Sequence, residues 1–247
     1  MINDDGPPKA RPRHWCIVDI ETRPDRFARI LSGQKRLRRS SPLHEVCAAA
    51  CLDIAPGEGG GFGRIVLASW HHEDFSERDI LVNVIDRLER CCSDGGAVVT
   101  YNGHRHDIPV LRLRQMRWWL GHDDLLRRLQ RDRTAHFDVM REFTGSLSQP
   151  PSLKEACAMI GVSLDGPVRA YESGRTPYEL QKCQSDVIGT AILLAYLTVS
   201  AGGGNDALSM SLGKIGGALR AIENVHPHLA RFAASPLLGE GATPWGG

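Results

Sequence analysis

The sequence contains no apolar run of the roughly 18 or more residues that a membrane-spanning helix requires. Residues 1–13 are polar and proline-containing, so they lack the apolar stretch of a secretory signal. Hydrophobic residues make up 42% of the chain and charged residues 24%, the balance of an ordinary soluble globular protein. These features predict a cytoplasmic protein that does not enter membranes, with a disordered lead-in over residues 1–13.

Cysteines spaced as in zinc sites are also absent. The chain has seven cysteines, an odd number, and none of them forms a Cys-x-x-Cys pair. We therefore predict that they are reduced and mostly buried as small hydrophobic side chains. No internal repeat is present, and 247 residues allow one substantial α/β core rather than two full domains.

The net charge of +1 does not by itself indicate a polyanionic partner, but the basic residues are unevenly distributed. They crowd two stretches: Arg23, Arg26, Arg29, Lys35, Arg36, Arg38 and Arg39, and then Arg112, Arg114, Arg117, Arg127, Arg128, Arg131 and Arg133. Two such stretches beside an acidic site would suit a phosphate backbone. Either stretch alone is explained equally well as the solvated surface of a loop or helix.

Hydrophobic periodicity predicts a mixed α/β order. Strands are expected at 14–20, 44–54, 64–70, 97–101 and 136–140, and helices at 79–91, 108–120, 156–160, 177–199 and 208–224. Ser152 and Glu155 have the spacing of a capping box ahead of the helix predicted at 156–160. The order predicts a three-strand meander that begins a sheet completed by crossover connections.

Two acidic residues end the first predicted strand, which is otherwise almost continuously apolar. Asp19 and Glu21 stand two apart on an extended chain, so their side chains leave the same face and can converge on one cation. Carboxylate oxygens are ligands that Mg²⁺ and Mn²⁺ favour. Asp-x-Glu alone is a common pattern, but burying two carboxylates at the end of an apolar strand is costly unless something neutralises them.

Two further acids occupy element boundaries or helix faces. Asp107 follows the 97–101 strand and an Asn-Gly turn, where a helix begins, and its alternative role is that of a helix N-cap. Asp186 lies within the long 177–199 helix, where an acid ordinarily marks the solvent boundary of the apolar face. Both become candidates for a shared site with Asp19 and Glu21 only if the fold brings them together.

These segments together resemble the three exonuclease motifs of DEDD nucleases, which belong to the ribonuclease H-like superfamily. The resemblance is carried by Ile-Val-Asp-Ile-Glu-Thr at 17–22, by the segment 101–111, and by 183–190 with its Asp-Val and Thr. It is closest to the predicted 3′-5′ exonucleases related to the proofreading domain of family-B DNA polymerases, over residues 14–200. Supporting positions, similar in order and spacing, are Ser152, Leu153, Gly161, Gly166, Val168, Tyr171 and Gly174.

The resemblance implies a ribonuclease H-like fold, a mixed five-stranded sheet flanked by helices, and a site for two Mg²⁺ or Mn²⁺ ions. The implied metal ligands are Asp19, Glu21, Asp107 and Asp186. As a hypothesis, Asp19 bridges both ions, Glu21 and Asp186 hold the ion that activates water, and Asp107 supports the second ion through water. Residues expected near the terminal nucleotide are Thr22, Tyr101, Asn102 and His106, while Asp138 is expected to have a structural or supporting role.

One position departs from the family pattern. The superfamily has a Tyr four residues before the last Asp, or a His five residues before it, and here Lys182 and Gln181 stand at these places. Lys182 shares a helix face with Asp186, so it could bind a substrate phosphate, act as a base after losing its proton, or compete with a metal ion. Further alternatives for the missing group are Tyr178, Tyr171, and the histidines that flank Asp107, His104 and His106.

We predict one exonuclease domain over residues 14–200 and a C-terminal helical extension with a tail over 201–247. The predicted activity is hydrolysis of single-stranded DNA or RNA from the 3′ end by two-metal-ion catalysis, releasing nucleoside 5′-monophosphates. Lys182 is included among the catalytic candidates as an electrostatic helper. The alternative is a catalytically weakened module on the same fold that binds nucleic acid or a protein partner.

Overall fold

The computed structural model describes residues 14–33, 43–57, 60–145, 148–164, 177–198 and 204–239. The predicted lead-in, the positions Gly166 to Gly174, and the basic residues Lys35 to Arg39 lie outside these ranges, as does the end of the predicted tail.

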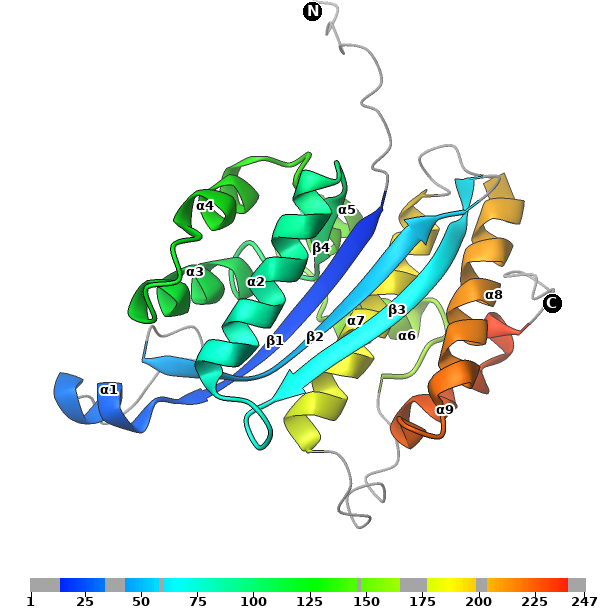
Figure 1. The fold of residues 1–247 in the computed structure, drawn as a ribbon. Coiled ribbons are helices and arrows are strands. Elements are labelled where there is room, and N and C mark those ends of the chain that lie inside the picture. Colours follow the sequence, from blue (N-terminus) through cyan, green and yellow to red (C-terminus); the bar gives the residue numbers. More distant parts are fainter. Residues whose placement is uncertain are drawn as a thin grey trace, which may run out of the picture.

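A five-stranded mixed sheet in the order β3-β2-β1-β4-β5 forms the centre of the molecule (Figure 1). The strands β1 (Trp15–Pro24), β2 (His44–Pro56) and β3 (Phe62–His71) form an antiparallel meander. The short strand β4 (Ala97–Thr100) pairs parallel with β1, and β5 (His136–Asp138) pairs parallel with β4. The prediction of a ribonuclease H-like mixed sheet flanked by helices is confirmed.

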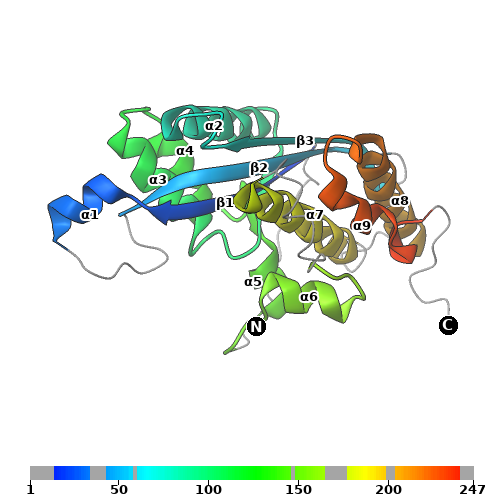
Figure 2. The same ribbon diagram turned by 90° about the horizontal axis from the view of Figure 1, so that it is seen from below.

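Helices cover both faces of the sheet (Figure 2). One face carries α2 (Glu77–Ser93), α3 (Asp107–Arg117) and α4 (Asp123–Arg131). The other carries α5 (Val139–Thr144), α6 (Leu153–Met159), α7 (Tyr178–Thr198) and α8 (Gly204–Ile222), followed by the short turns η4 (Pro227–Leu229), α9 (Ala230–Ala233) and η5 (Pro236–Leu238).

The two apolar cores follow from the alternation of side chains along β1. Cys16, Val18 and Ile20 face the core beneath α2, α3 and α4, whereas Ile17 joins the core beneath α7 and α8. α8 contributes Leu212 and other buried residues to this second core, so the described part of the 201–247 extension packs against the central sheet.

Four short α-helices, α1 (Arg26–Ser32), α4, α5 and the four-residue α9, were not predicted from the sequence. α1 buries no residue, α4 buries only two of its nine, and α5 begins at Val139, within the segment expected to be a strand. α1 and α5 span only 7 and 6 residues, too few for an apolar period to stand out. α4 does have buried Leu126 and Leu129 at helical spacing, a signal that could have predicted it. β1 also extends four residues beyond its predicted end.

The seven cysteines are all free thiols, and six of them are buried. Among the described residues, no helix has both the length and the apolarity needed to cross a membrane.

Candidate metal centre

Three carboxylates converge where β1 meets α7. Asp19 and Glu21 leave β1 on the same face as Ile17, and Asp186 points toward them from α7, two turns into that helix. One carboxylate oxygen from each residue lies within 4.8 Å of the others. The strand alternation expected for Asp-x-Glu therefore places both acids on the face that α7 covers.

Asp19 lies deepest in this group. Its Oδ2 atom is buried without a hydrogen-bond partner, and the buried thiol of Cys183 donates a hydrogen bond to the same carboxylate. Burial, followed by repulsion from Asp186 and Asp107, raises the pKa of Asp19 well above its usual value, although Lys182 opposes the shift. An under-neutralised buried carboxylate of this kind is stabilised by a cation.

Asp107 lies next to this group rather than in it. Its side chain is 2% exposed, and Oδ1 accepts a hydrogen bond of 3.2 Å from the backbone N–H of Ile20, the residue between Asp19 and Glu21. His106 takes the N-cap position of α3, and Asp107 is the first helical residue, so Asp107 is not the N-cap. Burial raises the pKa of Asp107 to about 7, against the hydrogen bond from Ile20 that lowers it.

Lys182 bridges two of the three converging carboxylates. Its Nζ donates to Oδ2 of Asp186 at 2.8 Å and to Oε1 of Glu21. Burial alone would lower the pKa of Lys182, but the attraction of Asp19, Asp186 and Glu21 raises it overall. The amino group is therefore an ammonium in this arrangement, which argues against the role of a neutral base.

The turn after β4 holds two of the residues expected near a terminal nucleotide. Tyr101 donates its hydroxyl to the carbonyl of Pro151 at 2.7 Å, so this hydroxyl is engaged within the protein. Asn102 has a left-handed backbone with φ 64°, and its N–H donates to Asp138, which also accepts from the N–H of His104. Asp138 thus fixes the turn, while the side-chain oxygen of Asn102 is buried without a partner.

Thr22 and His106 border the acidic group. A β-bulge between Glu21 and Thr22 leaves Cys47 of β2 unpaired in the register, and bulges of this kind re-aim neighbouring side chains. Thr22 Oγ1 lies 3.3 Å from Nδ1 of His44. Burial lowers the pKa of His106. The positive charges of Lys182 and His44 lower it further, whereas the carboxylate of Glu21 raises it, so the imidazole of His106 lies near all three side chains.

Sequence reasoning missed His44 as part of this neighbourhood. Its side chain is buried, and its Nε2 atom has no hydrogen-bond partner. The sequence placed His44 at the start of a strand but gave no signal of its contact with Thr22, because the pairing of β1 with β2 joins residues that are 22 apart. Tyr178, weighed as a substitute hydroxyl, is exposed at the start of α7.

Much of the second basic stretch is neutralised within the protein. Arg112 and Arg127 pair with Asp123, and Arg128 pairs with Asp132. Arg114 is buried and pairs with Asp25 and Glu77, and Arg117 also pairs with Asp25. We therefore no longer expect the whole stretch to contact a phosphate backbone. Only its exposed arginines remain candidates for that contact.

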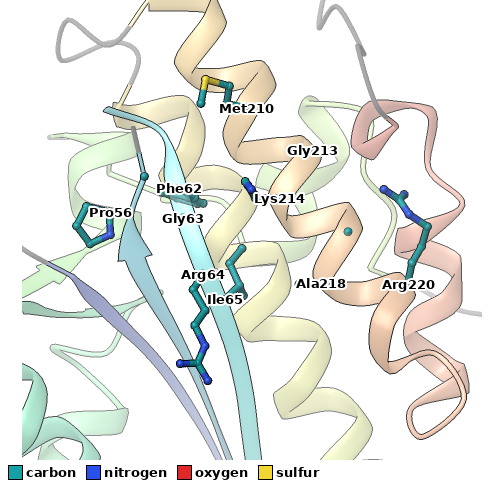
Figure 3. A pocket seen from close by; sticks show the side chains of 12 residues that line it. Pro56, Phe62, Gly63, Arg64, Ile65, Met210, Gly213, Lys214, Ala218 and Arg220 are labelled. Atoms are coloured by element: carbon teal, nitrogen blue, oxygen red, sulfur yellow. The ribbon is translucent and has the colours of Figure 1, made fainter. Parts of the chain in front are cut away.

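A separate cavity lies away from the acidic group. It has a volume of about 890 Å³ and opens between β3 and α8 (Figure 3). Its walls include Arg64, Lys214 and Arg220, together with Phe62 and Pro56 at the end of the sheet where β1 begins. The acidic group lies toward the opposite end of β1, so this cavity does not hold it.

The residues at the acidic group fit a divalent cation. Asp19, Glu21 and Asp186 supply hard oxygen donors within 4.8 Å of one another, and Oδ2 of Asp19 has no hydrogen-bond partner within the part of the chain that the structure describes. The combination of this group with a sheet of order β3-β2-β1-β4-β5 defines an α/β domain of the exonuclease type.

The model of a known family matches residues 39–235, and its description is a predicted 3′-5′ exonuclease related to the exonuclease domain of PolB. The chain belongs to this family. The matched range includes Asp107, Lys182 and Asp186, whereas Asp19 and Glu21 precede it.

Solved structures similar to this chain include two large enzymes. The family B DNA polymerase of the archaeon Pyrobaculum calidifontis is 18% identical with a TM-score of 0.46, covering 93% of this chain and 28% of the polymerase. Exonuclease I of E. coli, in complex with a dT13 oligonucleotide, is 11% identical with a TM-score of 0.35, covering 88% of this chain and 45% of that enzyme. Comparison with curated proteins gives no match.

Proposed function

We propose that this chain is a metal-dependent exonuclease that removes nucleotides from the 3′ end of single-stranded nucleic acid. The observation that carries the proposal is the convergence of Asp19 and Glu21 of β1 with Asp186 of α7, where Oδ2 of Asp19 is buried without a hydrogen-bond partner among the described residues. The family to which the chain belongs supports the polarity of the reaction. Water attacks the terminal phosphorus, the bond to the 3′ oxygen of the preceding nucleotide breaks, and a nucleoside 5′-monophosphate leaves.

Asp19, Glu21 and Asp186 would hold Mg²⁺ or Mn²⁺, and Asp107 would support a second ion. Bound there, the ions lower the pKa of water and neutralise charge that develops on the phosphodiester. Asp107 also holds the backbone of Ile20 between the two acids of β1, so it positions both of them. Thr22, Asn102 and His106 border the group and would contact the terminal nucleotide, together with the ring of Tyr101.

Lys182 serves in this proposal as an ammonium rather than as a base. It balances Glu21 and Asp186 in the absence of metal, and its side chain is 43% exposed, so it can turn toward a phosphate oxygen of the substrate. A metal that enters the group competes with this ammonium for the same carboxylates. Metal affinity and phosphate binding are therefore both expected to depend on Lys182.

The test is hydrolysis of an oligonucleotide in Mn²⁺, comparing wild type with Asp19→Asn. Because Asp19 is the central ligand in the proposal, we expect the rate to fall by about 10⁴-fold, or ~5 kcal/mol of transition-state stabilisation. Products of a 5′-labelled strand should shorten stepwise, and a strand with a blocked 3′ end should stay intact. Unchanged degradation by Asp19→Asn would refute the proposal. The control is Glu45→Gln, which removes a carboxylate paired with Arg23 on the surface of β2.

The same fold could instead serve as a binding module, and the ion pairs of Lys182 with two of the carboxylates favour this second candidate. Lys182→Tyr separates the two. A large gain in hydrolysis by the variant would show that the natural site is weakened, whereas a loss would show that the lysine takes part in the reaction. Salt-sensitive binding of nucleic acid with no uptake of Mn²⁺ or Ca²⁺ by the wild type would favour the module.

A further inference from the structure

A surface at the carboxyl end of β1 combines exposed aromatic rings with arginine. α1 follows β1 directly, and the last turn of α3 lies against it, at the far end of the molecule from α8 (Figure 1). We define the aromatic–arginine surface as Phe27 of α1 with Arg117, Trp118 and Trp119 at the end of α3. All four residues are exposed.

The arginine is held between two of the rings. The guanidinium of Arg117 lies 5.9 Å from the centroid of Phe27 and 5.9 Å from that of Trp118. Its Nη1 atom also lies 2.9 Å from Oδ2 of Asp25, a carboxylate that is 3% exposed. A guanidinium anchored from below by a buried acid and stacked on two rings is fixed in place, with its charge still accessible at the surface.

Trp118 is fixed in the same way. Its indole N–H donates to Oε2 of Glu77 at 2.8 Å, and Glu77 is itself held by two hydrogen bonds from Arg114. The acids of the surface, Asp25 and Glu77, therefore lie beneath it and are fully engaged. What faces solvent is aromatic and cationic.

Trp119 is the most unusual residue of the surface. Its indole is 93% exposed, and its backbone is left-handed with φ 53°, a conformation that a bulky residue rarely adopts. Neither burial nor local backbone preference accounts for a tryptophan here. A ring held out in water, next to a fixed arginine, suits a flat partner that carries negative charge.

We propose that the aromatic–arginine surface stacks the bases of a single-stranded nucleic acid upstream of its 3′ end. This inference rests on the proposed function, because it takes the 3′ end to lie at the acidic group. α3 connects the two places, since Asp107 begins it and Arg117 ends it, a length of about 16 Å. Stacking on aromatic rings tolerates any base, and Arg117, with the exposed Arg26 and Arg29 of α1, supplies charge for the backbone.

A second copy of this chain is the competing occupant, because Ile30 and Leu31 of α1 are also exposed. Charge decides between the two. The exposed charged residues of α1 and of the last turn of α3, Arg26, Arg29 and Arg117, are all cationic, so two copies of this surface would repel each other. A polyanion meets no such repulsion.

The experiment measures binding without hydrolysis, so its outcome does not depend on whether the protein cuts. Fluorescence anisotropy in EDTA compares a labelled oligonucleotide of about 12 nucleotides with an abasic oligomer of the same length and with a dinucleotide. We expect Trp119→Ala and Phe27→Ala each to weaken binding of the base-containing strand by about tenfold. Binding of the abasic oligomer and of the dinucleotide should change by less than about twofold.

Two controls accompany these variants. Trp119→Phe keeps an aromatic ring and should retain most of the affinity, and Val225→Ala removes an exposed apolar side chain elsewhere and should behave as wild type. Arg117→Ala should weaken binding of the abasic oligomer as well and reduce the salt dependence.

The proposal is overturned if the wild type does not bind the base-containing strand, if Trp119→Ala and Phe27→Ala bind it as the wild type does, or if they lose the abasic oligomer equally. Self-association of the wild type that these variants abolish, without a change in nucleic-acid binding, would assign the surface to a second copy instead.

Discussion

Two groups of carboxylates lie near β1, and they differ in how they are neutralised. The first comprises Asp19, Glu21 and Asp186 with the neighbouring Asp107. The ammonium of Lys182 is bonded to Glu21 and Asp186, whereas Asp19 and Asp107 have no ion pair among the described residues. In the second, Asp25 and Glu77 are bonded to the guanidiniums of Arg114 and Arg117. The first group has more negative charge than cation, and the second is balanced.

The pKa values of the two groups move in opposite directions. Burial raises the pKa of Asp19 and of Asp107, and the remaining negative charge of the group raises that of Asp19 further. Burial would also raise the pKa of Asp25, but the N–H of Ala28 together with Arg114 and Arg117 lowers it overall. Buried acids that are fully paired support the fold, whereas buried acids left with excess charge are suited to bind a cation.

Removing a cation from the balanced group should give the largest change in stability. Arg114→Met leaves Asp25 and Glu77 buried with one guanidinium fewer, so we expect the free energy of unfolding to fall by about 3 to 5 kcal/mol. Urea denaturation followed by circular dichroism measures this loss. The control is Arg112→Met, which breaks a partly exposed pair with Asp123 on the same helix and should cost about 1 kcal/mol or less. Equal losses in both variants would contradict the distinction between the groups.

Adding a cation to the under-neutralised group should stabilise the protein. At a Mn²⁺ concentration of 100 times Kd, we expect a gain of about 2.7 kcal/mol, measured as a rise in Tm. Asp186→Asn should lose this gain, because Asp186 supplies one of the three converging carboxylates. Glu45→Gln, outside the group, should retain it. A rise in Tm that survives in Asp186→Asn would place the metal elsewhere.

Local patterns in the sequence predict the sheet and the long helices. They also place Asp19 and Glu21 together, whereas Asp107 and Asp186 became candidates for the same site through the resemblance to the DEDD nucleases. Apolar alternation locates the strands, and Ser152 with Glu155 forms the capping box that its spacing predicts. The Asp-x-Glu spacing likewise places Asp19 and Glu21 on one face of β1.

Contacts between distant segments could not be predicted in this way. Arg114 reads in the sequence as one member of a basic stretch, but its role depends on Asp25, 89 residues earlier, and on Glu77. Asp107 reads as a possible N-cap, and only the end of the short strand β4 leaves the N–H of Ile20 free to bind it. Both assignments need the tertiary arrangement, since each partner lies on a different element.

A third expected effect, the smallest per step of the variable changed, is a pH dependence that distinguishes the two groups in the metal-free protein. The pKa of Asp107 is about 7 in the folded state and near 3.8 when unfolded, so the folded state binds more protons between these values. Stability should therefore fall as pH rises through this window, by at most about 1.4 kcal/mol per pH unit for one proton. The contribution of Asp25 to stability has the opposite pH dependence, because its lowered pKa gives stability that is lost as pH falls.

Tm measured in EDTA from pH 5 to 7 tests the slope expected for Asp107. Asp107→Asn should reduce this slope, with the raised pKa of Asp19 maintaining the rest, and saturating Mn²⁺ should remove it. An unchanged slope in Asp107→Asn would show that the charge of this carboxylate does not oppose folding.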